Sequence, residues 1–187
     1  MSDPDGYVAR RDAYHLALGR FLDEFAETER GLLVAVATAS SAHPDVWAVL
    51  FDTMTTANAC VALIKYMAAR DIPIPDNGKR AIDQLKLITT ARNSLVHKGG
   101  RISADGGYSS VNSLFAPQTK RPIDVAPDVL DAMVLDLRVI QVAVMLIGVA
   151  GGGGGPGIGF VDNPALYEEV MANFRKVAGD PWHYTPA

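Results

Sequence analysis

The sequence predicts an all-α protein, a helical bundle of about four to five helices with a loop or short hairpin inserted at 100–126. Three observations lead to this fold class. Apolar residues recur at three- and four-residue steps in several long stretches, as in amphipathic helices. Clusters of proline and glycine separate these stretches, and no region alternates strand with helix. With 187 residues, nearly half of them apolar, the chain is long enough for one domain with a core.

The first two helices are expected at about 8–40 and 45–70, separated by His43-Pro44, because a residue before proline disfavours the helical conformation. Small polar residues interrupt the second stretch around Thr55, but no proline or glycine does, so one continuous helix is predicted. The apolar positions expected to face the core of these two helices are Leu18, Phe21, Leu22, Phe25, Leu32, Leu33, Val36, Trp47, Leu50, Phe51, Met54, Cys60, Leu63, Ile64 and Met67.

A third helix is expected at about 78–98, with Gly99 at the position where a glycine commonly ends a helix. A hairpin using Tyr108, Val111 and Phe115 is one interpretation of the Gly-, Ser- and Pro-rich segment that follows. A fourth helix should begin near Pro127, since proline is acceptable in a first helical turn, and continue to about 150.

The domain organisation predicted from these elements is a bundle at 1–150, a glycine-rich linker at 151–163, and a C-terminal segment at 164–187 packed on the same domain. The C-terminal segment contains a last amphipathic helix at about 164–178 and the aromatic tail Trp182-His183-Tyr184. Such a tail folds back on its own domain, is disordered, or docks on a partner subunit or an RNA base, since aromatic faces stack on bases.

Charge is distributed unevenly along the chain. The net charge is −4, yet the ten Lys and Arg residues between Lys65 and Arg121 exceed the four Asp residues there by six, which leaves about −10 for the remainder. A local basic surface on an acidic protein is typical of a polyanion-binding face. Solvated faces of ordinary helices would give the same count.

Several features predict a cytoplasmic protein without membrane contact. The N-terminal MSDPDGY lacks the apolar run of a secretory signal. The most apolar stretch, Val139–Ala150, is shorter than the roughly 20 residues of a membrane span, which favours a buried core helix. Cys60 is the only cysteine, and the four histidines lack ligand spacing, so neither a metal site nor another cofactor is expected.

The stretch ARNSLVHKGG at 91–100 contains the candidate functional residues Arg92, Asn93 and His97. Arg offers a planar fork that matches phosphate oxygens, and His titrates near neutral pH. Asn93 and His97 share a helix face, whereas Arg92 lies roughly 140° away from His97 around an ideal helix. The two converge on one ligand only if the helix unwinds at its end or a second copy supplies the opposing wall, which favours a symmetric interface.

A structural role for these residues is the alternative, because Arg and His near a helix C-terminus satisfy the last carbonyls and complement the dipole. The chemistry that the three side chains suit is metal-free cleavage of RNA, in which the 2′-OH attacks its own phosphate. Lys86, Lys98 and Arg101 are candidates for contacts with the RNA backbone, from their charge and their proximity in the sequence.

Residues 82–99, IDQLKLITTARNSLVHKG, resemble the motif helix of the HEPN superfamily, in which His follows Arg after four to six residues, often with a polar residue directly after the Arg. The Arg-Asn…His ending is similar also to that of mannitol-repressor-like proteins. The opening ALGRFLDEFAETERGLLVAVA looks like the first long helix of such domains, in which an aromatic-rich start leads to a Glu, here Glu29.

The resemblance implies a helical homodimer with facing motif helices, and a metal-independent endoribonuclease of toxin, phage-defence or RNA-processing type. Arg92 would bind the scissile phosphate, His97 would act as general acid or base, and Asn93 would position it. A cognate antitoxin or regulatory protein is an expected partner besides RNA. Gly99 occupies the place of a Tyr that is modified in one toxin type, so that regulation is not expected. Other members are inactive, which leaves a non-catalytic dimerisation or regulatory interaction module as the alternative.

Overall fold

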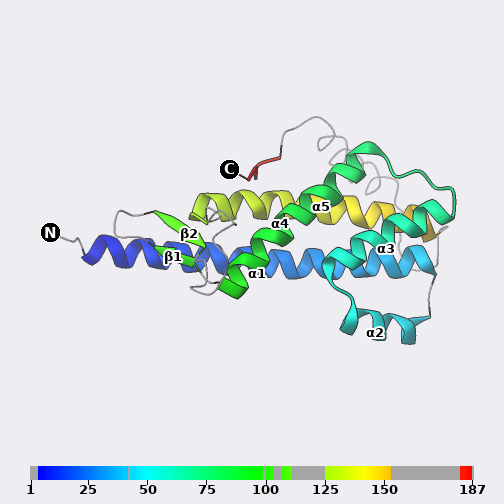
Figure 1. The fold of residues 1–187 in the computed structure, drawn as a ribbon, viewed down its shortest axis with the longest axis horizontal. Coiled ribbons are helices and arrows are strands. Elements are labelled where there is room, and N and C mark those ends of the chain that lie inside the picture. The colour runs from blue at the N-terminus through cyan, green and yellow to red at the C-terminus, as the bar shows by residue number, and fades with distance from the viewer. Residues whose placement is uncertain are drawn as a thin grey trace, which may run out of the picture.

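The computed structural model describes residues 4–41, 43–98, 100–102, 107–110, 125–152 and 182–186. Within these residues the chain forms five helices and one small hairpin, which confirms the predicted all-α bundle (Figure 1). The elements in chain order are α1 (Pro4–Ser40), α2 (Pro44–Thr53), α3 (Thr56–Ala69), α4 (Asp76–Lys98), β1 (Gly100–Ile102), β2 (Tyr108–Ser110) and α5 (Pro127–Gly152).

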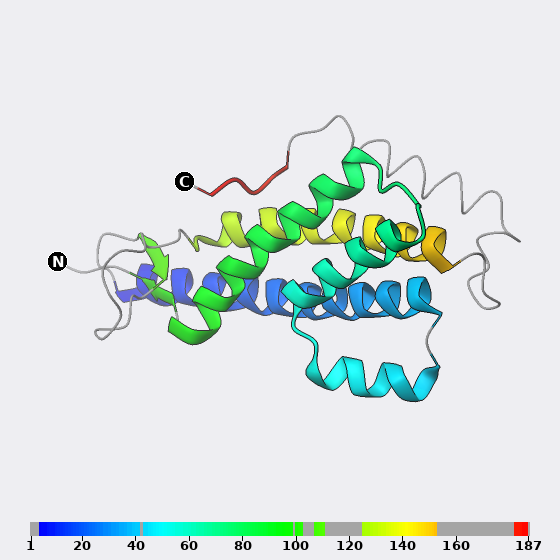
Figure 2. The same ribbon diagram turned by 45° about the vertical axis from the view of Figure 1, so that its right-hand side comes forward.

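The two longest helices, α1 and α5, lie side by side and run in the same direction (Figures 1 and 2). Arg20 of α1 pairs with Asp131 near the start of α5 at 2.8 Å. At the other end, Ala39 approaches Gly151, near the C-terminal end of α5. Because the helices are parallel, their C-terminal ends meet at one end of the bundle.

Small residues allow α1 and α5 to approach closely near this end. A Cβ atom added to Gly148 would lie 2.6 Å from the Cα of Ala35, and one added to Gly151 would lie 2.8 Å from the Cβ of Ala39. Carbon atoms prefer separations of about 3.5–4.0 Å. Glycine is therefore required at these two positions for the observed packing.

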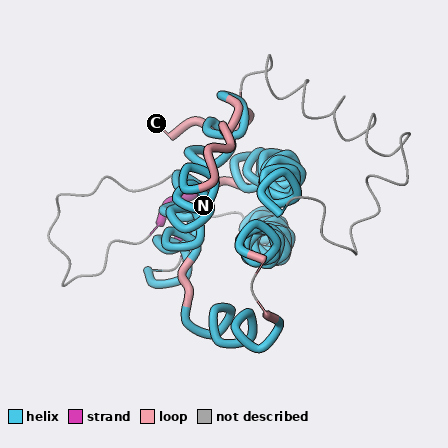
Figure 3. Tube along the Cα trace, turned by 90° about the vertical axis from the view of Figure 1, so that its right-hand side faces the viewer, coloured by secondary structure: helices cyan, strands magenta, loops and turns pink. Residues whose placement is uncertain are grey.

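The core lies between α1, α5 and the pair formed by α3 and α4, which cover one side of the two long helices (Figure 3). The short helix α2 lies away from the main bundle (Figure 2). The largest fully buried side chains are Phe21, Leu32, Val36, Leu63, Met67, Ile82, Leu85, Ile88, Leu130, Met133, Leu137 and Ile140.

By length and composition, the α5 segment Pro127–Gly151 is apolar enough to cross a membrane, with a mean hydropathy of 2.0. This apolar segment is longer than the stretch at 139–150 from which a core helix was expected. Half of the most apolar window is buried inside the bundle. The close packing on α1 agrees with the expected core helix.

The prediction of one helix at 45–70 is wrong, because the chain breaks at Met54-Thr55 between α2 and α3. Thr55 has an extended backbone, and its hydroxyl accepts a hydrogen bond from the N–H of Asn58, which caps the start of α3. Thr56 then donates its hydroxyl proton to Glu29 of α1. The Thr55 cap therefore starts a new helix at a point in the sequence that has neither proline nor glycine.

The hairpin expected within 100–126 is present in part: β1 pairs antiparallel with β2, and Ile102 lies opposite Tyr108. The Tyr108 ring stacks on Tyr14 of α1, with centroids 5.8 Å apart. Val111, Phe115 and the helix expected at 164–178 lie outside the described residues. Gly151 and Gly152 do not begin the linker as predicted, because they form the end of α5.

Candidate functional site

The helix α4 positions Arg92, Asn93 and His97 at its C-terminal end. One face of α4 is buried in the core, and the three candidate residues lie beside or opposite this face. Asn93 and His97 are exposed, whereas Arg92 is partly buried. The residues that anchor the buried face are Ala81, Ile82, Leu85, Ile88, Ala91 and Leu95.

The guanidinium group of Arg92 lies over the ring of Phe25 on α1, with Cζ 5.4 Å from the ring centroid. Its Nη1 donates a hydrogen bond of 3.1 Å to the Oδ1 of Asn93, and its buried Nε has no acceptor. None of the described carboxylates forms an ion pair with it. Stacking and the Asn93 amide therefore hold Arg92 in place while its charge stays uncompensated.

The His97 side chain is exposed and makes no hydrogen bond with any residue that the structure describes. It lies one turn beyond Asn93 on the same face of α4. Since α4 remains helical to Lys98, the helix end does not unwind to bring Arg92 and His97 together. Within one copy of the chain, Arg92 faces α1 and His97 faces solvent.

The residues proposed for RNA contacts differ in their surroundings. Lys86 pairs with Asp83 at 2.8 Å, and both side chains are exposed, so the lysine charge is partly balanced. Lys98 is the last residue of α4, and Arg101 lies in β1 opposite Ser109. Both follow His97 closely along the chain, which keeps them as candidates.

Part of the basic segment at 65–121 is engaged within the fold. Lys79 pairs with Asp76 at 3.2 Å, and Lys86 pairs with Asp83. For these two lysines the interpretation as solvated helix faces describes the contacts well. These two pairs partly balance the positive charge on the first half of α4.

Sequence reasoning missed the role of Arg70. Its Nη1 donates to the carbonyl of Ala39 at 3.1 Å and to that of Gly151 at 2.5 Å. These carbonyls lie in the last turns of α1 and α5, where unpaired oxygens and the negative ends of both helix dipoles meet. Arg70 thus caps the ends of α1 and α5, at the other end of the molecule from Arg92. No local pattern shows it, because the three residues are far apart in sequence.

The aromatic tail docks on its own bundle through a buried carboxylate, Asp136 of α5. Asp136 accepts hydrogen bonds from the backbone N–H groups of His183 and Tyr184 at 2.9 and 3.0 Å, and its Oδ1 lies 3.0 Å from the Nδ1 of His183. Gln84 of α4 donates both to Asp136 and to the Tyr184 carbonyl. The tail therefore binds between α4 and α5.

Cys60 lies on α3 and is buried in the core, and burial raises the pKa of its thiol to about 11. A thiol with so high a pKa is protonated at neutral pH and is a poor nucleophile or metal ligand. The described part of the chain contains no group of three or more His, Cys, Asp or Glu side chains arranged to hold a metal ion.

Comparisons with known proteins found no similar chain: no protein-family model matches, and neither the curated proteins nor the solved structures contain a match.

Proposed function

We propose that the chain is an endoribonuclease of HEPN type that cuts RNA without a metal ion, with a toxin, phage-defence or RNA-processing role. One observation carries the proposal: Arg92 and His97 are not used to cap α4. His97 is exposed without a hydrogen-bond partner among the described residues, and Arg92 has no carboxylate partner there. A guanidinium without a carboxylate partner and an exposed imidazole at the end of the same helix suit a phosphodiester substrate.

The reaction would be transesterification within the RNA. A base takes the proton from the 2′-OH, the 2′-oxygen attacks the adjacent phosphorus, and the 5′-oxygen leaves with a proton from an acid. The products are a 2′,3′-cyclic phosphate and a 5′-hydroxyl. One His97 takes the proton from the 2′-OH as general base and then, as the imidazolium, gives a proton to the leaving 5′-oxygen. Arg92 stabilises the charge on the phosphate oxygens. Asn93 was expected to position His97, but in this proposal it holds the Arg92 guanidinium, which donates to its Oδ1.

A homodimer is part of the proposal, because Arg92 and His97 point in different directions on one α4. In a symmetric pair with facing α4 ends, His97 of one copy lies opposite Arg92 of the other. Lys98 and Arg101 would then flank the same cleft and contact the RNA backbone. Binding to RNA should weaken as salt rises, since lysine and arginine release counterions from phosphates.

The test is incubation of the purified protein with structured RNAs in EDTA, beside Arg92→Ala and His97→Ala. Loss of a general acid or base should slow cleavage by about 10²–10⁴-fold. His15→Ala and Arg30→Ala are matched controls, because both residues are exposed on α1. Cleavage by the parent and controls, with cyclic-phosphate ends, supports the proposal. Equal cleavage by all five proteins would point to a contaminant and refute it.

A mixing experiment tests the shared site separately. Arg92→Ala and His97→Ala chains are each inactive under the proposal. If they are unfolded and refolded together, the mixed dimers retain one Arg92 and one His97 and should recover part of the activity. No recovery, in a mixture that forms dimers, would mean that each copy carries its own complete site.

A non-catalytic interaction module is the second candidate, and the apolar residues on α4 favour it. Val96 is 50% exposed between Asn93 and His97, and Leu87 is 44% exposed on the same helix. Such side chains beside polar ones are common at protein interfaces. Under this alternative Val96→Asp disrupts the dimer or a complex with another protein, and the parent protein leaves RNA intact in EDTA.

A further inference from the structure

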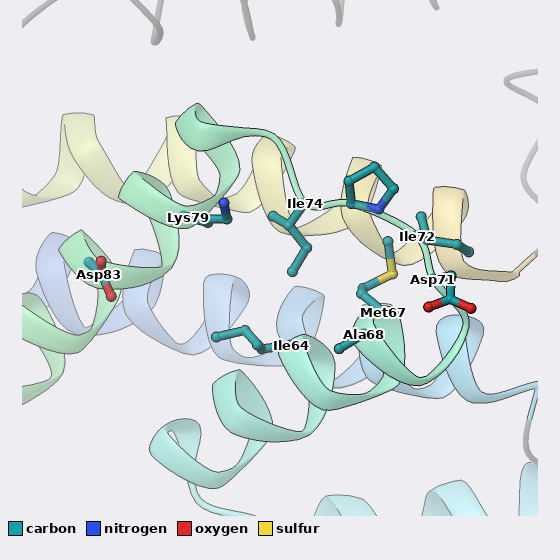
Figure 4. Close-up of a pocket in the computed structure, with 9 residues that line it drawn as sticks. Ile64, Met67, Ala68, Asp71, Ile72, Ile74, Lys79 and Asp83 are labelled. Atoms are coloured by element: carbon teal, nitrogen blue, oxygen red, sulfur yellow. The ribbon is translucent and has the colours of Figure 1, made fainter.

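A pocket of about 570 Å³ opens between α3, the connector that follows it and the first turns of α4 (Figure 4). This volume lies within the range of about 300–1,000 Å³ that is usual for sites that bind small molecules. The wall is mainly apolar, and three charged side chains lie along its edge. The apolar lining includes Ile64, Met67, Ile72, Pro73 and Ile74, and the charged residues are Asp71, Lys79 and Asp83.

The connector gets its shape from the way α3 ends. The N–H of Asp71 donates to the Ala68 carbonyl at 3.1 Å, and the N–H of Ile72 donates to the Met67 carbonyl at 3.0 Å. This pattern is a Schellman motif, whose residue after the C-cap is left-handed and is usually glycine. Asp71 takes that conformation here, with φ at 55°. The motif brings Ile72 close to Met67 and sets the Asp71 carboxylate at one end of the pocket (Figure 4).

Charge differs along the pocket edge. Lys79 is paired with Asp76, and Asp83 is paired with Lys86, so the charges of Lys79 and Asp83 are each balanced by a neighbour on α4. The Asp71 carboxylate forms no ion pair or hydrogen bond with the residues that the structure describes. An unbalanced negative charge next to an apolar surface is complementary to a ligand with one cationic group and an apolar body.

We infer that this pocket binds a small organic cation, an ammonium or guanidinium group on an alkyl or aryl body. The cationic group pairs with Asp71, and the apolar body lies against Met67, Ile72 and Ile74. The site is separate from the Arg92–His97 end of α4.

The experiment compares three probes of equal chain length, n-hexylammonium, hexan-1-ol and hexanoate, titrated into the full chain and followed by chemical shifts of backbone amides. Saturable shifts near Ile72 and Ile74 should occur at the lowest concentration for hexylammonium. Hexanoate should bind least. Stronger or equal binding of hexanoate or hexanol would overturn the inference, as would the absence of saturation with hexylammonium.

Two variants locate the binding. Asp71→Asn keeps the shape and tolerates the left-handed backbone, and should weaken hexylammonium binding about two- to fivefold, since an exposed ion pair contributes little. Ala68→Phe places a ring in the pocket from an exposed position and should abolish binding. Asp23→Asn, an exposed carboxylate on α1, is the matched control and should leave binding unchanged. Unchanged binding in Ala68→Phe would place the ligand elsewhere and refute the assignment.

Discussion

Replacement of Gly148 by alanine tests the close packing of α1 on α5. The new methyl carbon would lie 2.6 Å from the Cα, 2.7 Å from the Cβ and 2.9 Å from the carbonyl oxygen of Ala35. Two of these three atoms belong to the backbone of α1, so rotation of a side chain cannot relieve the overlap. One helix must move away from the other by about 1 Å to restore ordinary carbon contacts.

The expected magnitude follows from two opposing effects. Overpacking of a well-packed core usually costs about 1–3 kcal/mol. Alanine favours the helix over glycine by about 1 kcal/mol, which offsets part of this cost. Gly148→Ala should therefore lower the free energy of unfolding by up to about 2 kcal/mol. For a chain of this size that corresponds to a fall in Tm of up to about 8 °C.

Gly19→Ala is the matched control on α1. A Cβ at Gly19 would meet nothing within 4 Å, and the position is exposed. Only the helix preference changes there, so the free energy of unfolding should rise by about 0.5–1 kcal/mol. Urea unfolding followed by circular dichroism measures both variants. If Gly148→Ala were as stabilising as Gly19→Ala, α1 and α5 would not pack as closely as described.

Three further substitutions test single contacts. Thr55→Ala should lower the free energy of unfolding in urea by about 1 kcal/mol, because it removes the cap on the Asn58 N–H. Asp136→Asn should lower the free energy of unfolding by about 1–3 kcal/mol, since an amide nitrogen replaces an oxygen that accepts a hydrogen bond from the tail. In a chain shortened to residue 181 the same substitution should lower it less. An equal loss in both chains would contradict the docking of the tail on Asp136. The pKa of Cys60 rises from 9.0 to about 11 on folding, so the thiol loses its proton at a lower pH in the unfolded chain than in the folded one. The free energy of unfolding should therefore fall by up to about 2–3 kcal/mol between pH 9 and 11. Burial raises the pKa of Tyr14 as well, so urea unfolding of Cys60→Ala at both pH values isolates the thiol; an unchanged pH dependence would contradict its role.

The helices could be predicted because their apolar residues follow a helical period. Of the helices predicted at 8–40, 78–98 and 127–150, each appears with ends that differ by a few residues. The break before α3 could not be predicted in the same way. Thr55 is a common residue on the surface of a helix, and its capping role depends on a local backbone change.

The buried polar contacts were the least predictable part of the fold. Asp136 stands just before the apolar stretch at 139–150 in the sequence, yet it is 1% exposed and accepts hydrogen bonds from α4 and the tail. These donors are about 50 residues away on either side, so no short pattern reveals them. The positions of Arg92, Asn93 and His97 on α4 could be predicted, because they depend on one helix. The contact of Arg92 with Phe25 depends on how α4 crosses α1 and could not.

The parallel pairing of α1 with α5 has a consequence for synthesis of the chain. The partner residues Arg20 and Asp131 are 111 positions apart, and Arg70 contacts a carbonyl 81 positions later. At about 5–20 residues per second, the ribosome needs roughly 5–20 s after it makes α1 to deliver its partner. During this interval the 37-residue helix α1 has α3 to cover part of its buried face but lacks α5, the helix with which it makes its largest contact. The nascent chain therefore presents a long hydrophobic surface to chaperones before the bundle can close.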